Sequence, residues 1–123
     1  MKNLNVLVVA AHPDDEVLGC GGAMAQHSIR GDNVSTLFLT NGVDARDNSN
    51  SDDIEQRINA MKKALNTLGV DDFECKNFPD NSLDTVSLIE ITKAIESFQQ
   101  HRPKPDRIYT HHAGDLNIDH QLA

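Results

Sequence analysis

Histidine and carboxylate side chains gather at two places in the sequence, and the first is the run AHPDDE that begins at Ala11. Pro13 favours an extended backbone at His12 and can itself begin a helical turn. In such a turn His12 and Asp15 lie on one face, with the spacing that two ligands of one metal ion require. Asp14 would point beside the ion, where a carboxylate can take up and release a proton. The alternative is an acidic first helical turn that needs no ion.

The second gathering is the run THHAGDLNIDH over residues 110–120. One histidine from this run would complete a His–Asp–His set with an open fourth position, as in catalytic zinc sites. The same ligands also suit Fe²⁺. Taken alone, a histidine in a loop more often makes a hydrogen bond than binds a metal. The metal-site prediction therefore depends on the two runs meeting in space.

Strands and helices are predicted to alternate along the chain and to bring the two runs together. The apolar patterns indicate strands over residues 4–10, 34–39, 73–78 and 107–110, and helices over residues 22–30, 53–68 and 85–98. This alternation predicts an α/β fold of Rossmann-like type, with three α/β/α layers and a mainly parallel sheet. Ligands bind at the carboxyl ends of the strands in such sheets. Both runs follow predicted strands, so we expect them at the same edge.

Composition limits the classes of partner. The 123 residues suffice for one domain, and the net charge of −8, with no basic cluster longer than Lys62-Lys63, argues against nucleic acid. The longest apolar stretch, residues 6–11, is too short to span a membrane. A basic leader is not evident either, so we expect a cytoplasmic protein. Cys20 and Cys75 lack metal-binding spacing and are expected to be reduced thiols.

The runs VLVVAAHPDDEVLGCGG, PDNSLD and YTHHAGDLNIDH resemble, in order and across the whole chain, the PIG-L/LmbE family of zinc-dependent N-deacetylases. The resemblance implies removal of an acetyl group from an N-acetylglucosamine-type amine, either an amino sugar or its conjugate. Carried over by position, His12, Asp15 and His120 would be the zinc ligands. Asp14 would be the general base.

Several further residues receive predicted roles. Asn117 stands where the family often has a histidine that stabilises the transition state, and its amide could donate a hydrogen bond instead. His111 or His112 could also bind substrate as donors. Asp80 would either bind a sugar hydroxyl or simply form a turn. Asp119 directly precedes His120 and is expected to orient that ligand.

The family's domain usually continues beyond the length of this chain. We therefore expect residues 1–123 to be the N-terminal portion of one such domain, truncated at its C-terminal side. The fourth strand would then lie at an exposed edge, which favours self-association as a homo-oligomer. A non-catalytic metal-binding fragment is the alternative function.

A nucleotide-binding module is a weaker alternative. Gly19, Gly21 and Gly22 suggest it, but they follow the first strand too late for the dinucleotide-binding motif. The two histidines outside the motifs, His27 and His101, are predicted to be surface residues.

Overall fold

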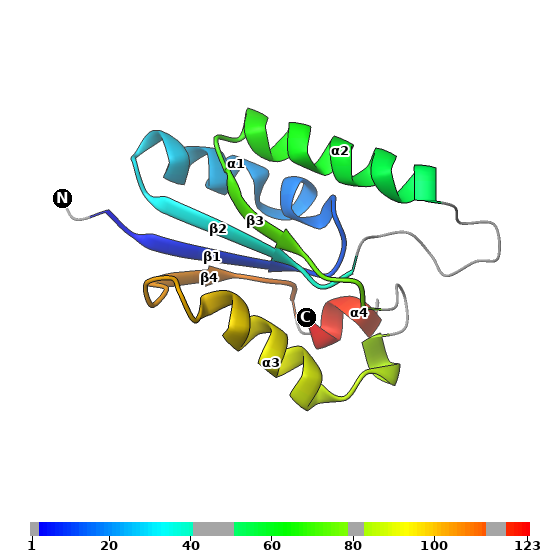
Figure 1. The fold of residues 1–123 in the computed structure, drawn as a ribbon. Helices are drawn as coiled ribbons and strands as arrows, with labels where there is room; N and C mark the ends of the chain where they lie inside the picture. The colour runs from blue at the N-terminus through cyan, green and yellow to red at the C-terminus, as the bar shows by residue number, and fades with distance from the viewer. Residues whose placement is uncertain (1–2, 41–50, 79–82, 113–117) are drawn as a thin grey trace.

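The computed structural model describes residues 3–40, 51–78, 83–112 and 118–123. Its four strands are β1 (Asn5–Ala10), β2 (Asn33–Phe38), β3 (Asp72–Cys75) and β4 (Arg107–Tyr109). They form one parallel sheet in the order β3-β2-β1-β4 (Figure 1). The predicted α/β fold with a parallel sheet is confirmed.

Helices cover both faces of this sheet. Helices α1 (Asp15–Ile29) and α2 (Ser51–Thr67) lie on one face, and α3 (Leu88–Gln99) lies on the other (Figure 1). A short 3₁₀ turn, η1 (Leu83–Thr85), precedes α3, and the last described element is α4 (Ile118–Leu122). Among these ranges, no helix is both long and apolar enough to span a membrane.

The apolar run of β1 forms part of two cores, since successive side chains of a strand point to opposite faces. Val6 and Val8 pack with residues of α1 and α2, whereas Leu7 and Val9 pack with residues of α3. This three-layer arrangement explains why β1 is apolar at nearly every position.

Helix α1 begins earlier than the sequence predicted. We expected a helix from residue 22, but α1 starts at Asp15 and includes the three glycines, with a kink at Cys20 where φ is −144° and ψ is 22°. Propensity argues against a glycine-rich helix, yet Gly21 is buried and faces Leu68 beyond α2. The early start places the acidic first turn of α1 directly after β1, where the helix dipole favours it.

The strand order creates a crevice at the carboxyl end of β1. From β1 the chain proceeds to β2 and β3 on one side, and β4 then pairs with the other side of β1. Connections diverge at such a point, which is where parallel α/β sheets bind ligands. In the described part of the chain β4 is an edge strand, as predicted, and its Ile108 is 57% exposed.

Candidate metal centre

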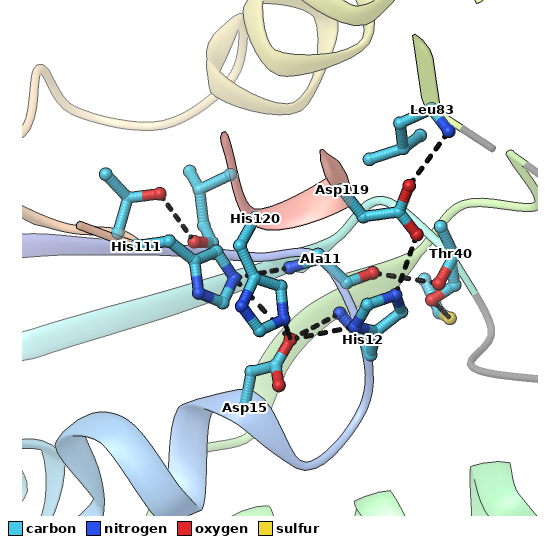
Figure 2. A network of polar contacts seen from close by, with 11 residues as sticks. Ala11, His12, Asp15, Thr40, Leu83, His111, Asp119 and His120 are labelled. Carbon is cyan, nitrogen blue, oxygen red and sulfur yellow. Dashed lines mark hydrogen bonds and ion pairs between the residues drawn. The ribbon is translucent and has the colours of Figure 1, made fainter. Parts of the chain in front are cut away.

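Three histidines surround the carboxylate of Asp15 at the end of β1 (Figure 2). His12 Nδ1 and His120 Nε2 each lie 3.2 Å from Asp15 Oδ2, and His111 Nε2 lies 3.5 Å from it. The backbone N–H of His12 donates to the same oxygen at 2.9 Å. His12 lies in the turn between β1 and α1, and Asp15 is the first residue of α1. The turn brings the two side chains together, as their three-residue spacing predicted.

The spacing of these atoms fits one zinc-sized ion. His12, Asp15 and His120 each offer a ligand atom, and the three atoms lie within 4.8 Å of one another. Two ligands at zinc bond lengths and a tetrahedral angle are about 3.4 Å apart. The two His–Asp distances of 3.2 Å are close to that value. The donor types, two imidazole nitrogens and one carboxylate oxygen, suit zinc or Fe²⁺.

Asp119 determines which nitrogen of His12 is available. Its Oδ2 lies 2.9 Å from His12 Nε2, and its Oδ1 accepts the backbone N–H of Leu83 at 2.9 Å. Because an ionised carboxylate only accepts, Nε2 of His12 donates its proton to Asp119. Nδ1, which faces Asp15 Oδ2 at 3.2 Å, is therefore the nitrogen left for a metal ion. Carboxylates behind metal-binding histidines act in this way. The sequence predicted that Asp119 orients His120, the ligand that follows it, whereas the contact that the structure shows is with His12.

His111 continues the pairing of β4 with β1 beyond the last ladder pair. Its Nε2 accepts the backbone N–H of Ala11 at 3.0 Å, and Thr110 Oγ1 donates to the carbonyl of Val9 at 3.0 Å. The ring of His111 also stacks on His120, with centroids 3.9 Å apart. Since Nε2 of His111 accepts, Nδ1 carries the proton. A hydrogen bond from His111 to a substrate would therefore have to come from Nδ1.

The charges around Asp15 favour its ionised form. Burial acts to raise the pKa of Asp15, but hydrogen bonds from the side chain and backbone of His12, with the charges of His120 and His12, outweigh burial and lower that pKa. The pKa is thus shifted in the direction that a carboxylate ligand requires.

Asp14, the predicted general base, is exposed and precedes the first residue of α1. It occupies the N-cap position, yet its side chain makes no capping hydrogen bond. The Asp14 carboxylate therefore does not cap α1. His112, a predicted substrate-binding residue, is also exposed. Asn117 and Asp80 lie outside the described residues.

Glu16 is a buried acid that the sequence reasoning did not single out. It is 2% exposed, and within the described ranges neither carboxyl oxygen has a hydrogen-bond partner. Burial raises the pKa of Glu16 to about 7, and the charges of Asp14 and Asp15 act in the same direction. The signal in the sequence was its position one residue after Asp15, on the inner face of the helix.

The prediction that His27 is a surface residue is wrong. His27 is 4% exposed, with Nδ1 2.7 Å from Asp32 Oδ2 and Nε2 2.9 Å from the hydroxyl of Tyr109. Met24, one turn earlier, is buried on the same face of α1, and this was the local signal. His101, the other predicted surface histidine, is exposed.

Comparisons with known proteins show the family to which the chain belongs. The PIG-L family, described as GlcNAc-PI de-N-acetylase, matches residues 7–123. The chain is 31% identical over 123 residues to the uncharacterized deacetylase YaiS of Escherichia coli (strain K12), covering 97% of this chain and 63% of that protein.

Two solved structures share the fold. The conserved protein TT1542 from Thermus thermophilus has 30% identity and a TM-score of 0.77, and the match covers 98% of this chain and 51% of that one. The N,N'-diacetylchitobiose deacetylase from Pyrococcus horikoshii has 23% identity and a TM-score of 0.73, with 96% and 45% covered. At 23% identity the likeness shows the fold alone.

The chain spans between 45% and 63% of the length of these three relatives. The family match nevertheless includes both the AHPDDE run and the run over residues 110–120. This chain therefore belongs to the PIG-L family of deacetylases, which are hydrolases.

Proposed function

We propose that this chain carries the catalytic centre of a zinc-dependent N-deacetylase that acts on an N-acetyl amino sugar or its conjugate. The observation that carries the proposal is the convergence of one ligand atom each from His12, Asp15 and His120 within 4.8 Å. The substrate class is supported by the family description, which names a GlcNAc compound as the molecule that is de-N-acetylated.

Three protein ligands would leave the fourth coordination position of a zinc ion open. Three protein ligands, none of them cysteine, are typical of catalytic zinc, whereas closed structural sites favour cysteine. Bound zinc would act as a Lewis acid toward the acetamide carbonyl and would lower the pKa of water. His12 is already held in the correct tautomer by Asp119, at an Nε2–Oδ2 distance of 2.9 Å.

Asp14 is proposed as the general base. It takes a proton from the water whose oxygen bonds to the acetyl carbon. The carbon–nitrogen bond then breaks, and the proton on Asp14 passes to the departing amine, so the products are acetate and a free amine. The developing negative charge on the carbonyl oxygen needs a donor besides the ion. Asn117, His112 and the Nδ1–H of His111 are the candidates on this chain.

The rival function is metal binding without catalysis, with the same ligands and no turnover. Purified protein with zinc would be tested for metal content and for acetate release from N-acetylglucosamine and its glycosides. We expect one zinc per chain and release of acetate. Zinc without acetate release from any of these compounds would favour the rival.

The base assignment has its own test. Asp14→Asn should keep the metal and lose at least about 100-fold in kcat, the range for general-base catalysis. Asp71→Asn is the matched control, because Asp71 is an exposed aspartate before β3, at the opposite end of the sheet. Wild-type turnover in Asp14→Asn would exclude Asp14 as the base. The cytoplasmic location and the self-association stay predictions.

A further inference from the structure

A cavity of about 310 Å³ adjoins the metal centre, between α1 and the end of β4. Asp15 and His111 lie together at the centre (Figure 2). Both also line the cavity, so the cavity and the centre are continuous. Other parts of the wall come from Ala10, Gly19, Cys20 and Tyr109. The volume corresponds to about ten water molecules. A single acetyl methyl group would leave most of it empty.

Most polar groups that face this cavity already have partners. The hydroxyl of Tyr109 bonds to His27 at 2.9 Å, and Thr110 Oγ1 donates to Val9 at 3.0 Å. His111 Nε2 accepts the backbone N–H of Ala11.

Glu16 also lines the cavity, but its two oxygens have almost no accessible surface. What the wall offers away from the metal centre is therefore mainly carbon, including the ring of Tyr109, and the Cys20 sulfur, with the exposed His112 as a further polar side chain. Such a wall suits a hydrocarbon group better than the hydroxyls of a sugar, which would lose their hydrogen bonds to water.

We propose that this cavity receives the acyl group of the amide substrate, and that the centre accepts straight acyl chains longer than acetyl. The inference rests on the proposed function, because it places the scissile carbonyl at His12, Asp15 and His120. The amine side of the substrate then lies toward solvent. An apolar chain of several carbons gains the free energy of leaving water along the whole wall.

Gly19 lines the cavity and has no side chain to occupy it. A Cβ atom placed on Gly19 meets no atom within 4 Å, so a larger side chain can be accommodated there without a backbone shift. Gly22 offers the matched control, because a Cβ atom on it also meets nothing within 4 Å and Gly22 does not line the cavity. Both glycines belong to α1, so replacing either with leucine raises helix propensity by a similar amount.

The test measures binding of acetate, propionate, butyrate and hexanoate to zinc-loaded protein by calorimetry, since these carboxylates are the acyl products. Affinity is expected to rise about fourfold for each added methylene. In Gly19→Leu this rise should disappear while acetate binds as before, and Gly22→Leu should behave as wild type. Affinity that does not depend on chain length would overturn the proposal. So would an equal rise in all three proteins, or no binding at all.

Alkylation of Cys20 gives a second measurement that needs no variant. Hexanoate should slow its modification by iodoacetamide at pH 9, and acetate should not. Cys75, which does not line the cavity, is the internal control. Equal protection of Cys20 by both acids would contradict the assignment.

Hydrolysis assays separate this inference from the proposed function. Carboxylate binding that depends on chain length, without hydrolysis of N-acetyl- or N-butyrylglucosamine, would refute the deacetylase and leave the cavity assignment in place. Acetate release without any dependence of carboxylate binding on chain length would support the deacetylase and refute the cavity assignment. Affinity that rises along a series of n-alkylamines instead would show that the cavity receives the amine side.

Discussion

His12 Nε2 lies 2.9 Å from Oδ2 of Asp119, a carboxylate with no exposed surface that comes 107 positions later in the chain. The other oxygen of Asp119 holds the backbone of Leu83 in η1. One side chain thereby joins the end of β1, the turn before α3 and the first turn of α4. It also fixes the proton on His12 away from the candidate metal position.

Replacing Asp119 with Asn should weaken zinc binding without unfolding the protein. The amide oxygen can still accept from Leu83, but the amide NH₂ would donate to His12 Nε2 and move the ring proton to Nδ1. Zinc affinity is then expected to fall by about 10- to 100-fold. A competition titration with a chelating dye measures it. The control Asp84→Asn, at an exposed aspartate in η1, should bind zinc as tightly as wild type. Unchanged zinc affinity in Asp119→Asn would show that Asp119 does not set the protonated nitrogen of His12.

His111→Phe should destabilise the fold, because Ala11 is fully buried and its N–H would lose its acceptor. An unsatisfied buried donor costs about 1–3 kcal/mol in the free energy of unfolding. His111→Gln retains an acceptor at the same reach and should recover most of that loss. Urea denaturation of the metal-free proteins decides this, and equal stability of the two variants would contradict the role assigned to His111.

Glu16 predicts how stability depends on pH. Its pKa of about 7 in the folded state lies above the usual value of 4.5. The folded protein therefore binds more protons than the unfolded chain between these values, and its stability falls as pH rises from about 4.5 to 7. At pH 8, metal-free Glu16→Gln should exceed wild type by roughly 1–3 kcal/mol, and near pH 4.5 the two should agree.

Glu96→Gln, on an exposed part of α3, is the control for this comparison and should follow wild type at every pH. Chemical denaturation across the pH range measures the difference. A constant gap between Glu16→Gln and wild type from pH 4.5 to 8 would show that the Glu16 carboxyl does not titrate as described.

The His27 contacts predict a second effect on stability. His27→Phe keeps the approximate volume but removes the hydrogen bonds to Asp32 and Tyr109, so we expect a loss of about 2–4 kcal/mol. Tyr109→Phe removes one of the two hydrogen bonds and should lower the free energy of unfolding by less. The losses of the two single variants should not add in the double variant His27→Phe/Tyr109→Phe, because the two side chains are in contact. His101→Phe, at an exposed histidine, should leave the free energy of unfolding unchanged. Thermal and urea unfolding would both report the difference.

Much of the fold can be predicted from local sequence patterns. The apolar run of β1 requires cover on both faces, and Ile58, Met61 and Leu65 of α2 recur at helical spacing. Together they predict alternating strands and helices, and hence a parallel sheet. The beginning of α1 was mispredicted because glycine has low helix propensity, whereas the buried Gly21 packs near Leu68, which is distant in sequence.

Only part of the candidate site could be predicted from the sequence. The three-residue spacing of His12 and Asp15 is local, so the sequence could predict that they share a face. Which histidine of residues 110–120 joins them depends on where the chain after β4 turns, and the residue pattern alone left that open. The burial of His27 depends on Tyr109, which is 82 positions away. No local pattern contains such a contact.

The central claim is that His12, Asp15 and His120 hold one divalent ion. Anomalous diffraction at the zinc absorption edge, from a crystal grown with zinc, tests this claim most directly. We expect a single strong peak about 2.0–2.2 Å from His12 Nδ1, Asp15 Oδ2 and His120 Nε2. A well-ordered crystal with no peak at these three atoms, or with His120 turned away from Asp15, would contradict it.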